Sequence, residues 1–185
     1  MTVPFDVELA QEHGNSEEIR DVSPDKRFGV RILFNAKPEN ATKPDYILVT
    51  DCDLVSLPSK AKLMKIQMSG EFSVPHLVWS SDSNWFAFSL SSGPRVSDTY
   101  IYHRAGDNFS EFETNNLTAD IAGDVRNNYV TPVRRLKPGL LLLKDEAMFR
   151  GGGGATVRFT ARFDEKTGET KIISQKKVSS SSKED

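Results

Sequence analysis

The sequence contains a single cysteine, Cys52, so it cannot form a disulfide bond within the chain. Of its three histidines, only His76 and His103 lie beyond the acidic N-terminal segment. No run approaches the roughly 18 apolar residues of a membrane-spanning helix. The formal net charge is only −2, which gives no electrostatic argument for nucleic-acid binding.

A chain of 185 residues has the usual size of one domain. Composition divides it into an acidic segment (1–21), a β domain (22–178) and a serine-rich tail (179–185) that we expect to be disordered. The first residues lack the basic and apolar regions of a signal peptide, so we expect a cytoplasmic protein. If Met1 stands in place of a removed signal peptide, we expect a secreted or periplasmic protein instead.

Short runs of alternating apolar and polar residues, separated by glycine, proline and asparagine, occupy most of the chain. This pattern predicts a mainly β, antiparallel fold. Strands are expected at 46–49 and 54–57, with a polar turn between them. One short helix is expected over 117–127, because Leu117, Ile121 and Val125 recur at helical spacing.

Two segments of the chain resemble each other. Residues 22–28 read Val-Ser-Pro-Asp-Lys-Arg-Phe and residues 79–85 read Trp-Ser-Ser-Asp-Ser-Asn-Trp, an offset of 57 positions. Each segment predicts a polar turn that leads into a strand, with Asp25 or Asp82 accepting hydrogen bonds within its own turn. A weaker third copy follows after the same interval, at residues 136–139.

Ser-Pro-Asp followed by a strand resembles the blade motif of TolB-type and WD40-like β-propellers, and also small bacterial proteins that carry such repeats. The resemblance covers residues 22–175 and implies four-stranded blades. Propellers usually have about four to eight blades, so roughly three units are too few to close a ring. We therefore expect an open, propeller-like array of about three blade-like units, or two packed antiparallel sheets.

Asp51 and Asp53 are candidate metal ligands, because divalent cations prefer oxygen ligands and two carboxylates at this spacing share one face of a strand. His76 or His103 could supply a further ligand, although their spacing matches no zinc motif. The alternative, which we favour, is a polar turn at residues 51–53 and two non-ligating histidines. We expect no metal site and no catalytic residues.

Two further clusters have more ordinary interpretations. Four glycines at 151–154 precede a predicted strand, whereas a phosphate-binding loop leads into a helix, so they indicate a connector. Arg134, Arg135 and Lys137, together with Trp79 and Trp85, could suit single-stranded nucleic acid. Strand alternation instead places both tryptophans in the core, where we expect them to be mostly buried.

The sequence favours a non-catalytic binding or interaction module, because no group of residues meets the standard of an active site. We expect another protein as its partner, with no nucleic acid, membrane or cofactor. The expected binding elements are the loops at 35–44, 91–97 and 149–155, presented on a rigid β scaffold. The alternative is a metal-dependent hydrolase that uses Asp51 and Asp53 with a histidine.

Overall fold

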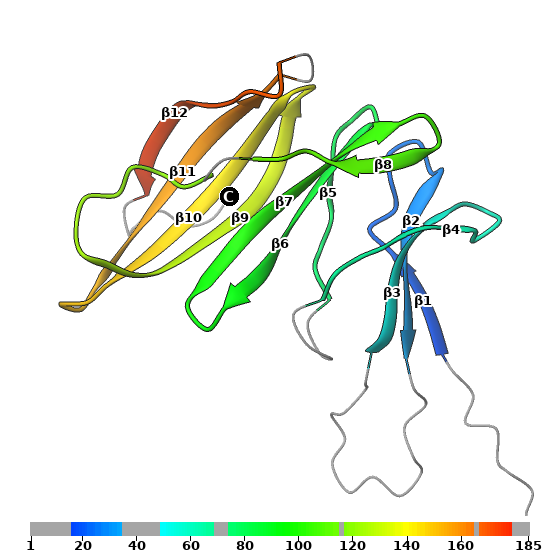
Figure 1. The fold of residues 1–185 in the computed structure, drawn as a ribbon, viewed down its shortest axis with the longest axis horizontal. Coiled ribbons are helices and arrows are strands. Elements are labelled where there is room, and N and C mark those ends of the chain that lie inside the picture. Colours follow the sequence, from blue (N-terminus) through cyan, green and yellow to red (C-terminus); the bar gives the residue numbers. More distant parts are fainter. Residues whose placement is uncertain (1–15, 35–48, 69–73, 115–116, 165–166, 179–185) are drawn as a thin grey trace, which may run out of the picture.

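The computed structural model describes residues 16–34, 49–68, 74–114, 117–164 and 167–178 (Figure 1). The described residues form strands, turns and loops, and no helix occurs among them. The mainly β, antiparallel prediction is therefore confirmed. The acidic residues 1–15, the predicted loop at 35–44 and the tail at 179–185 lie outside the described residues.

The strands form three consecutive antiparallel meanders, each of four strands. The first meander contains β1 (Ser16–Arg20), β2 (Phe28–Phe34), β3 (Val49–Ser56) and β4 (Lys62–Lys65). The second contains β5 (Val78–Trp79), β6 (Trp85–Gly93), β7 (Val96–Ala105) and β8 (Asn108–Glu111). The third contains β9 (Val125–Lys137), β10 (Leu140–Phe149), β11 (Gly154–Phe163) and β12 (Thr170–Val178).

The first meander is a separate four-stranded sheet, whereas the second and third share one sheet of eight strands. Their connection is a short parallel pairing of β7 with β9, in which Val96 faces Asn128 and Ser97 faces Tyr129. The first sheet runs from β1 to β4, and the second runs from β12 to β5, with β8 paired to β7 off this path. Figure 1 shows the three meanders side by side in chain order, with the second between the other two.

The middle meander separates two hydrophobic cores. In β6, Phe86 and Phe88 belong to the first core while Trp85 and Ala87 belong to the second, because successive strand residues point to opposite faces. The first core also contains side chains from β2 and β3, and the second contains side chains from β9, β10 and β11. The middle meander is thus buried on both faces, and each outer meander buries one face against it.

The predicted helix at 117–127 is wrong, because residues 117–124 form an irregular segment and β9 begins at Val125. We call residues 117–124 the strap, since they cross one face of the third meander (Figure 1). The strap's backbone N–H groups bond to side chains of that meander: Ala119 donates to Asp145 Oδ2 and Asp120 to Gln175 Oε1. Gly123, at φ +133°, is incompatible with a helix.

The two copies of the repeated turn have the same hydrogen bonds. Ser23 and Ser80 each donate a backbone N–H to the carbonyl five residues on, at 2.9 Å in both turns. Their hydroxyls accept the N–H of Phe28 at 3.0 Å and of Trp85 at 2.9 Å. Each turn precedes the second strand of its meander, and the turn at residues 138–139 does so in the third.

Asp25 and Asp82 hold these turns together, as the sequence predicted. Asp25 accepts hydrogen bonds from the Ser23 hydroxyl at 2.7 Å and from the backbone N–H of Arg27 at 3.1 Å. Burial alone would raise the pKa of each aspartate, but the hydrogen bonds from the serine hydroxyls and the turn N–H groups outweigh it and lower the pKa. Both carboxylates thus stabilise turns.

Candidate functional site

The predicted turn at residues 51–53 is wrong, because these residues lie within the continuous strand β3. Cys52 points into the first core, with no exposure, and burial raises the pKa of its thiol to about 12. Asp51 and Asp53 share the opposite face, since their cross-strand partners on β2 are Leu33 and Arg31. This is the geometry that a two-carboxylate metal site would need.

Cations of the protein itself already pair with these two carboxylates. Asp53 is 1% exposed, and its oxygens lie 2.8 Å from Arg31 Nη2 and 2.6 Å from Lys62 Nζ. Asp51 lies 3.2 Å from Lys65 Nζ. Burial would raise the Asp51 pKa, but the Lys65 hydrogen bond and the neighbouring lysine charges lower it overall.

The histidines lie apart from this pair of aspartates. His76 is mostly exposed and its Nδ1 is 3.4 Å from Asp21 Oδ1. His103, in β7, packs against Trp85 with 4.5 Å between ring centroids. Among the described residues, no three His, Cys, Asp or Glu side chains are grouped to hold a metal ion.

Of the four glycines at 151–154, the first three lie in the turn between β10 and β11, where Gly152 and Gly153 adopt φ +93° and +73°, and Gly154 begins β11. Because a strand follows this turn, its N–H groups do not gather at a helix N-terminus. The predicted loop at 91–97 lies mostly in strands, because β6 ends at Gly93 and β7 begins at Val96, and only residues 94–95 form the turn between them. Figure 1 shows both turns on the same side of the molecule.

A cationic surface covers the side of the third meander that faces away from the second core; we call it the outward face. In β10, Leu141 and Leu143 are buried in the core, so the alternate residues Leu142 and Lys144 point outward. The cross-strand register then places these cations on the outward face: Arg134, Lys137, Lys144, Arg158, Arg162, Lys171 and Lys176.

Three of these cations stand in one row across three adjacent strands. Lys144 faces Arg158, and Arg158 faces Lys176. Neighbouring strands are about 4.8 Å apart, and like charges directly opposite one another destabilise a sheet. Within the described residues, neither Arg158 nor Lys176 has an ion pair, while Lys144 pairs with Glu146 at 3.0 Å. We call these three residues the cationic row.

Sequence reasoning grouped Arg134 with Arg135 and Lys137, but the strand divides them. Arg134 and Lys137 point outward, whereas Arg135 pairs with Leu141 and points inward. Its guanidinium carbon lies 5.2 Å from the Trp85 ring centre and 5.8 Å from that of Phe163. The outward face was missed because its members come from four separate strands. Only the pairing register brings them together.

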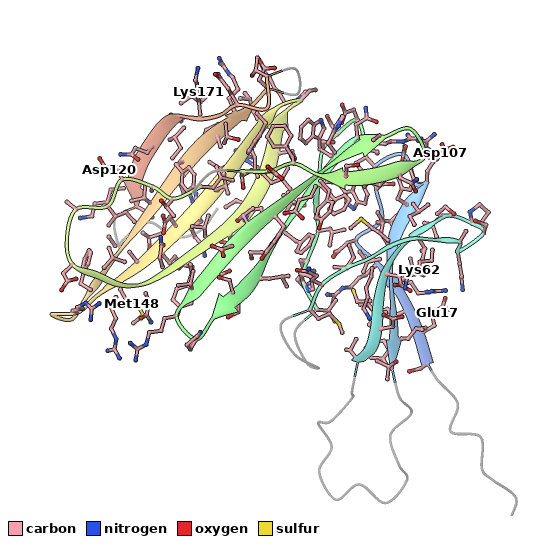
Figure 2. All side chains as sticks on the ribbon, in the orientation of Figure 1. Glu17, Lys62, Asp107, Asp120, Met148 and Lys171 are labelled. Carbon is pink, nitrogen blue, oxygen red and sulfur yellow. The ribbon has the colours of Figure 1, made fainter. Side chains whose placement is uncertain are left out.

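Two open hollows flank the strap. One, of about 620 Å³, is lined by strap residues 118–120 and β12 residues 172–175. The other, of about 440 Å³, lies between the strap and β7 and includes Asp98, Glu111 and Glu113. Figure 2 shows Asp120 on the strap and Lys171 on β12, at the same end of the molecule.

Comparison of the chain with protein-family models, with curated proteins and with solved structures found no match. No helix among the described residues has the length and apolar character needed to cross a membrane. The geometry of the residues themselves therefore carries the functional interpretation.

Proposed function

We propose that this protein is a non-catalytic binding module, and that the outward face of its third meander binds an acidic surface of another protein. The observation that carries the proposal is the cationic row of Lys144, Arg158 and Lys176. Like charges placed directly opposite one another weaken the free sheet. An acidic partner would relieve that repulsion and convert it into binding energy.

The arrangement of the three meanders supports a binding role for the outward face. Three four-stranded meanders packed through two cores resemble an open, propeller-like array of blade-like units. The end units of a stacked array need a polar outer face to remain soluble. A polar end face can carry both signs of charge. On the first meander Lys62 pairs with Asp53, whereas the outward face of the third carries seven cations beside the paired Glu146.

The surroundings of Asp51 and Asp53 give the hydrolase alternative no support. Lys62 lies 2.6 Å from Asp53 and 3.9 Å from Asp51, so an ammonium stands where the two carboxylates could share a metal ion. An additional cation would have to displace these ion pairs. We therefore propose no reaction for this protein.

Binding of a fluorescent polyglutamate peptide tests the proposal. Neutralising two members of the cationic row, with Arg158→Gln and Lys176→Gln, should weaken binding by about tenfold, which corresponds to about 1.4 kcal/mol. The same variant should unfold at equal or higher denaturant concentration, because it relieves the repulsion. Binding to the native protein should weaken as added salt screens the charges.

The matched control removes two cations from the first meander, with Lys60→Gln and Lys65→Gln, whose side chains are 51% and 63% exposed. This control should retain peptide binding. Equal losses in the two variants would place binding elsewhere. Preferential binding of oligothymidylate over polyglutamate would replace the protein partner with a nucleic acid.

A further inference from the structure

Strand β12 (Thr170–Val178) is an edge strand of the eight-stranded sheet. Among the described residues it pairs only with β11, so the N–H and C=O groups on its other side lack a β partner. All its residues except the first and last are exposed. Such an edge is a template on which another strand can form.

The edge combines positive charge with apolar surface. Lys171, Lys176 and Lys177 lie on β12, and the strand contains no acidic residue. Ile172 and Ile173 are 39% and 45% exposed, although isoleucine is usually buried. These two isoleucines border the hollow of about 620 Å³ beneath the strap.

The strap fixes the position of this hollow beside the edge. Asp120 donates its backbone N–H to Gln175 Oε1 at 3.2 Å, so the strap is tied to the middle of β12. The preceding residue, Ala119, donates its backbone N–H to the buried Asp145 at 2.8 Å. The hollow therefore has a strand on one side and an anchored loop on the other.

We infer that β12 accepts an extended acidic segment of the partner protein as an additional strand. The backbone of that segment pairs with the free edge, a large apolar side chain enters the hollow beside Ile172, and flanking carboxylates meet Lys171 and Lys176. Main-chain bonds supply affinity in such strand addition, while pockets for alternate side chains supply specificity. This inference rests on the proposed function, because it assumes the same acidic partner.

A second copy of this chain is a poorer occupant of the same edge. If two β12 strands paired antiparallel about Ser174, each Lys171 would face Lys177 of the other copy. Like charges directly opposite destabilise a strand pair. Lysines on an edge strand therefore oppose self-pairing and favour an acidic strand.

The test uses an acidic peptide with one central leucine, prepared in two forms that are N-methylated at alternate residues. An added strand turns only every second N–H toward β12, so one form should bind about tenfold or more weakly than the other. Equal affinities of the two forms would overturn strand addition. The proposed function would still stand if polyglutamate binding remained sensitive to the cationic row.

A pair of substitutions tests the hollow. Ile172→Ser should weaken binding of the leucine peptide by about tenfold, because the side chain loses its apolar contact. Val133→Ser is the matched control, since Val133 on β9 is also 39% exposed, and it should leave binding unchanged. Equal effects of the two substitutions would overturn the assignment of the hollow. Dimerisation that competes with the peptide would identify a second copy as the occupant.

Discussion

The backbone N–H of Asp25 donates a hydrogen bond to the Ser83 hydroxyl over 3.0 Å. The two residues belong to different copies of the repeated turn, so the turns of the first and second meanders contact each other. Ser83 is 1% exposed and adopts φ +58°, like Lys26 at φ +60° in the first copy. The two copies of the repeated turn therefore connect the first meander to the second through a hydrogen bond.

Loss of one turn hydroxyl should lower the stability of the fold. Ser80→Ala leaves the buried N–H of Trp85 without its acceptor at 2.9 Å and removes a donor to Asp82. The free energy of unfolding should fall by about 1–3 kcal/mol, measured by urea denaturation. Ser81→Ala, at an exposed position of the same turn, should change it by less than about 0.5 kcal/mol. Similar values for both would contradict a stabilising role for the Ser80 hydroxyl.

Truncation of Trp85 should lower the free energy of unfolding more than truncation of any other side chain in the second core. It is 1% exposed and contacts the rings of His103, Phe112 and Phe163. Trp85→Ala should lower the free energy of unfolding by about 3–5 kcal/mol, because it creates a cavity. Trp79→Ala should cost less, since Trp79 is only half-buried. A silent Trp85→Ala variant would show that the second core does not depend on this ring.

Much of the fold could be predicted because local patterns specify strands and turns. Alternation placed the side chains of β2, and the repeated Ser-x-Asp turn identified the start of the second strand in two meanders. The position of Trp85 in a core followed from the same alternation. These features depend on neighbouring residues, which a sequence shows directly.

Features that depend on tertiary partners could not be predicted. Leu117, Ile121 and Val125 have helical spacing, yet the strap's N–H groups are bonded to Asp145 and Gln175 of the third meander. Long-range pairing overrides weak helix propensity in such a segment. The outward face likewise depends on the register of four strands, which the order of residues alone does not reveal.

The aspartates of β3 should differ in their contribution to stability. Asp53→Asn removes a buried carboxylate that pairs with Arg31 and Lys62, so the free energy of unfolding should fall by about 1.5–3 kcal/mol. Asp51→Asn should lower the free energy of unfolding by less than about 1 kcal/mol, since its partner Lys65 is 63% exposed.

The melting temperature of the native protein should be the same in EDTA, zinc, calcium or magnesium. A metal-dependent rise that the double variant abolishes would favour the hydrolase alternative.

Arg135 should be replaceable by an uncharged side chain. Its guanidinium nitrogens are buried with no hydrogen-bond partner among the described residues, and burial lowers its pKa to about 10. Arg135→Met keeps a long side chain against Trp85 and removes the buried charge, so stability should be unchanged or rise by about 1–4 kcal/mol. Arg134→Met, on the exposed side of β9, should shift stability by less than about 0.5 kcal/mol. A large loss in Arg135→Met would show that the ring contacts require the cation.

Asp145 should make stability depend on pH. Its side chain is fully buried, and burial raises its pKa even though the Ala119 N–H and the Asn128 side chain act in the opposite direction. The folded protein thus binds this proton more tightly than the unfolded chain, whose aspartate titrates near about 3.9. The resulting stabilisation is fully present below the unfolded pKa and is lost as the pH rises through the folded pKa.

Asp145→Asn removes this titration while retaining an oxygen that can accept the Ala119 N–H, which lies 2.8 Å from the carboxylate. The variant should gain stability relative to the native protein as the pH rises from the acid range to neutrality, measured by urea denaturation at several pH values. Glu146→Gln is the matched control, because Glu146 is the next residue of β10 but is 47% exposed on the outward face. It should show no such gain. If Asp145→Asn instead lost stability relative to the native protein as the pH rose, the ionised carboxylate itself would be stabilising the strap.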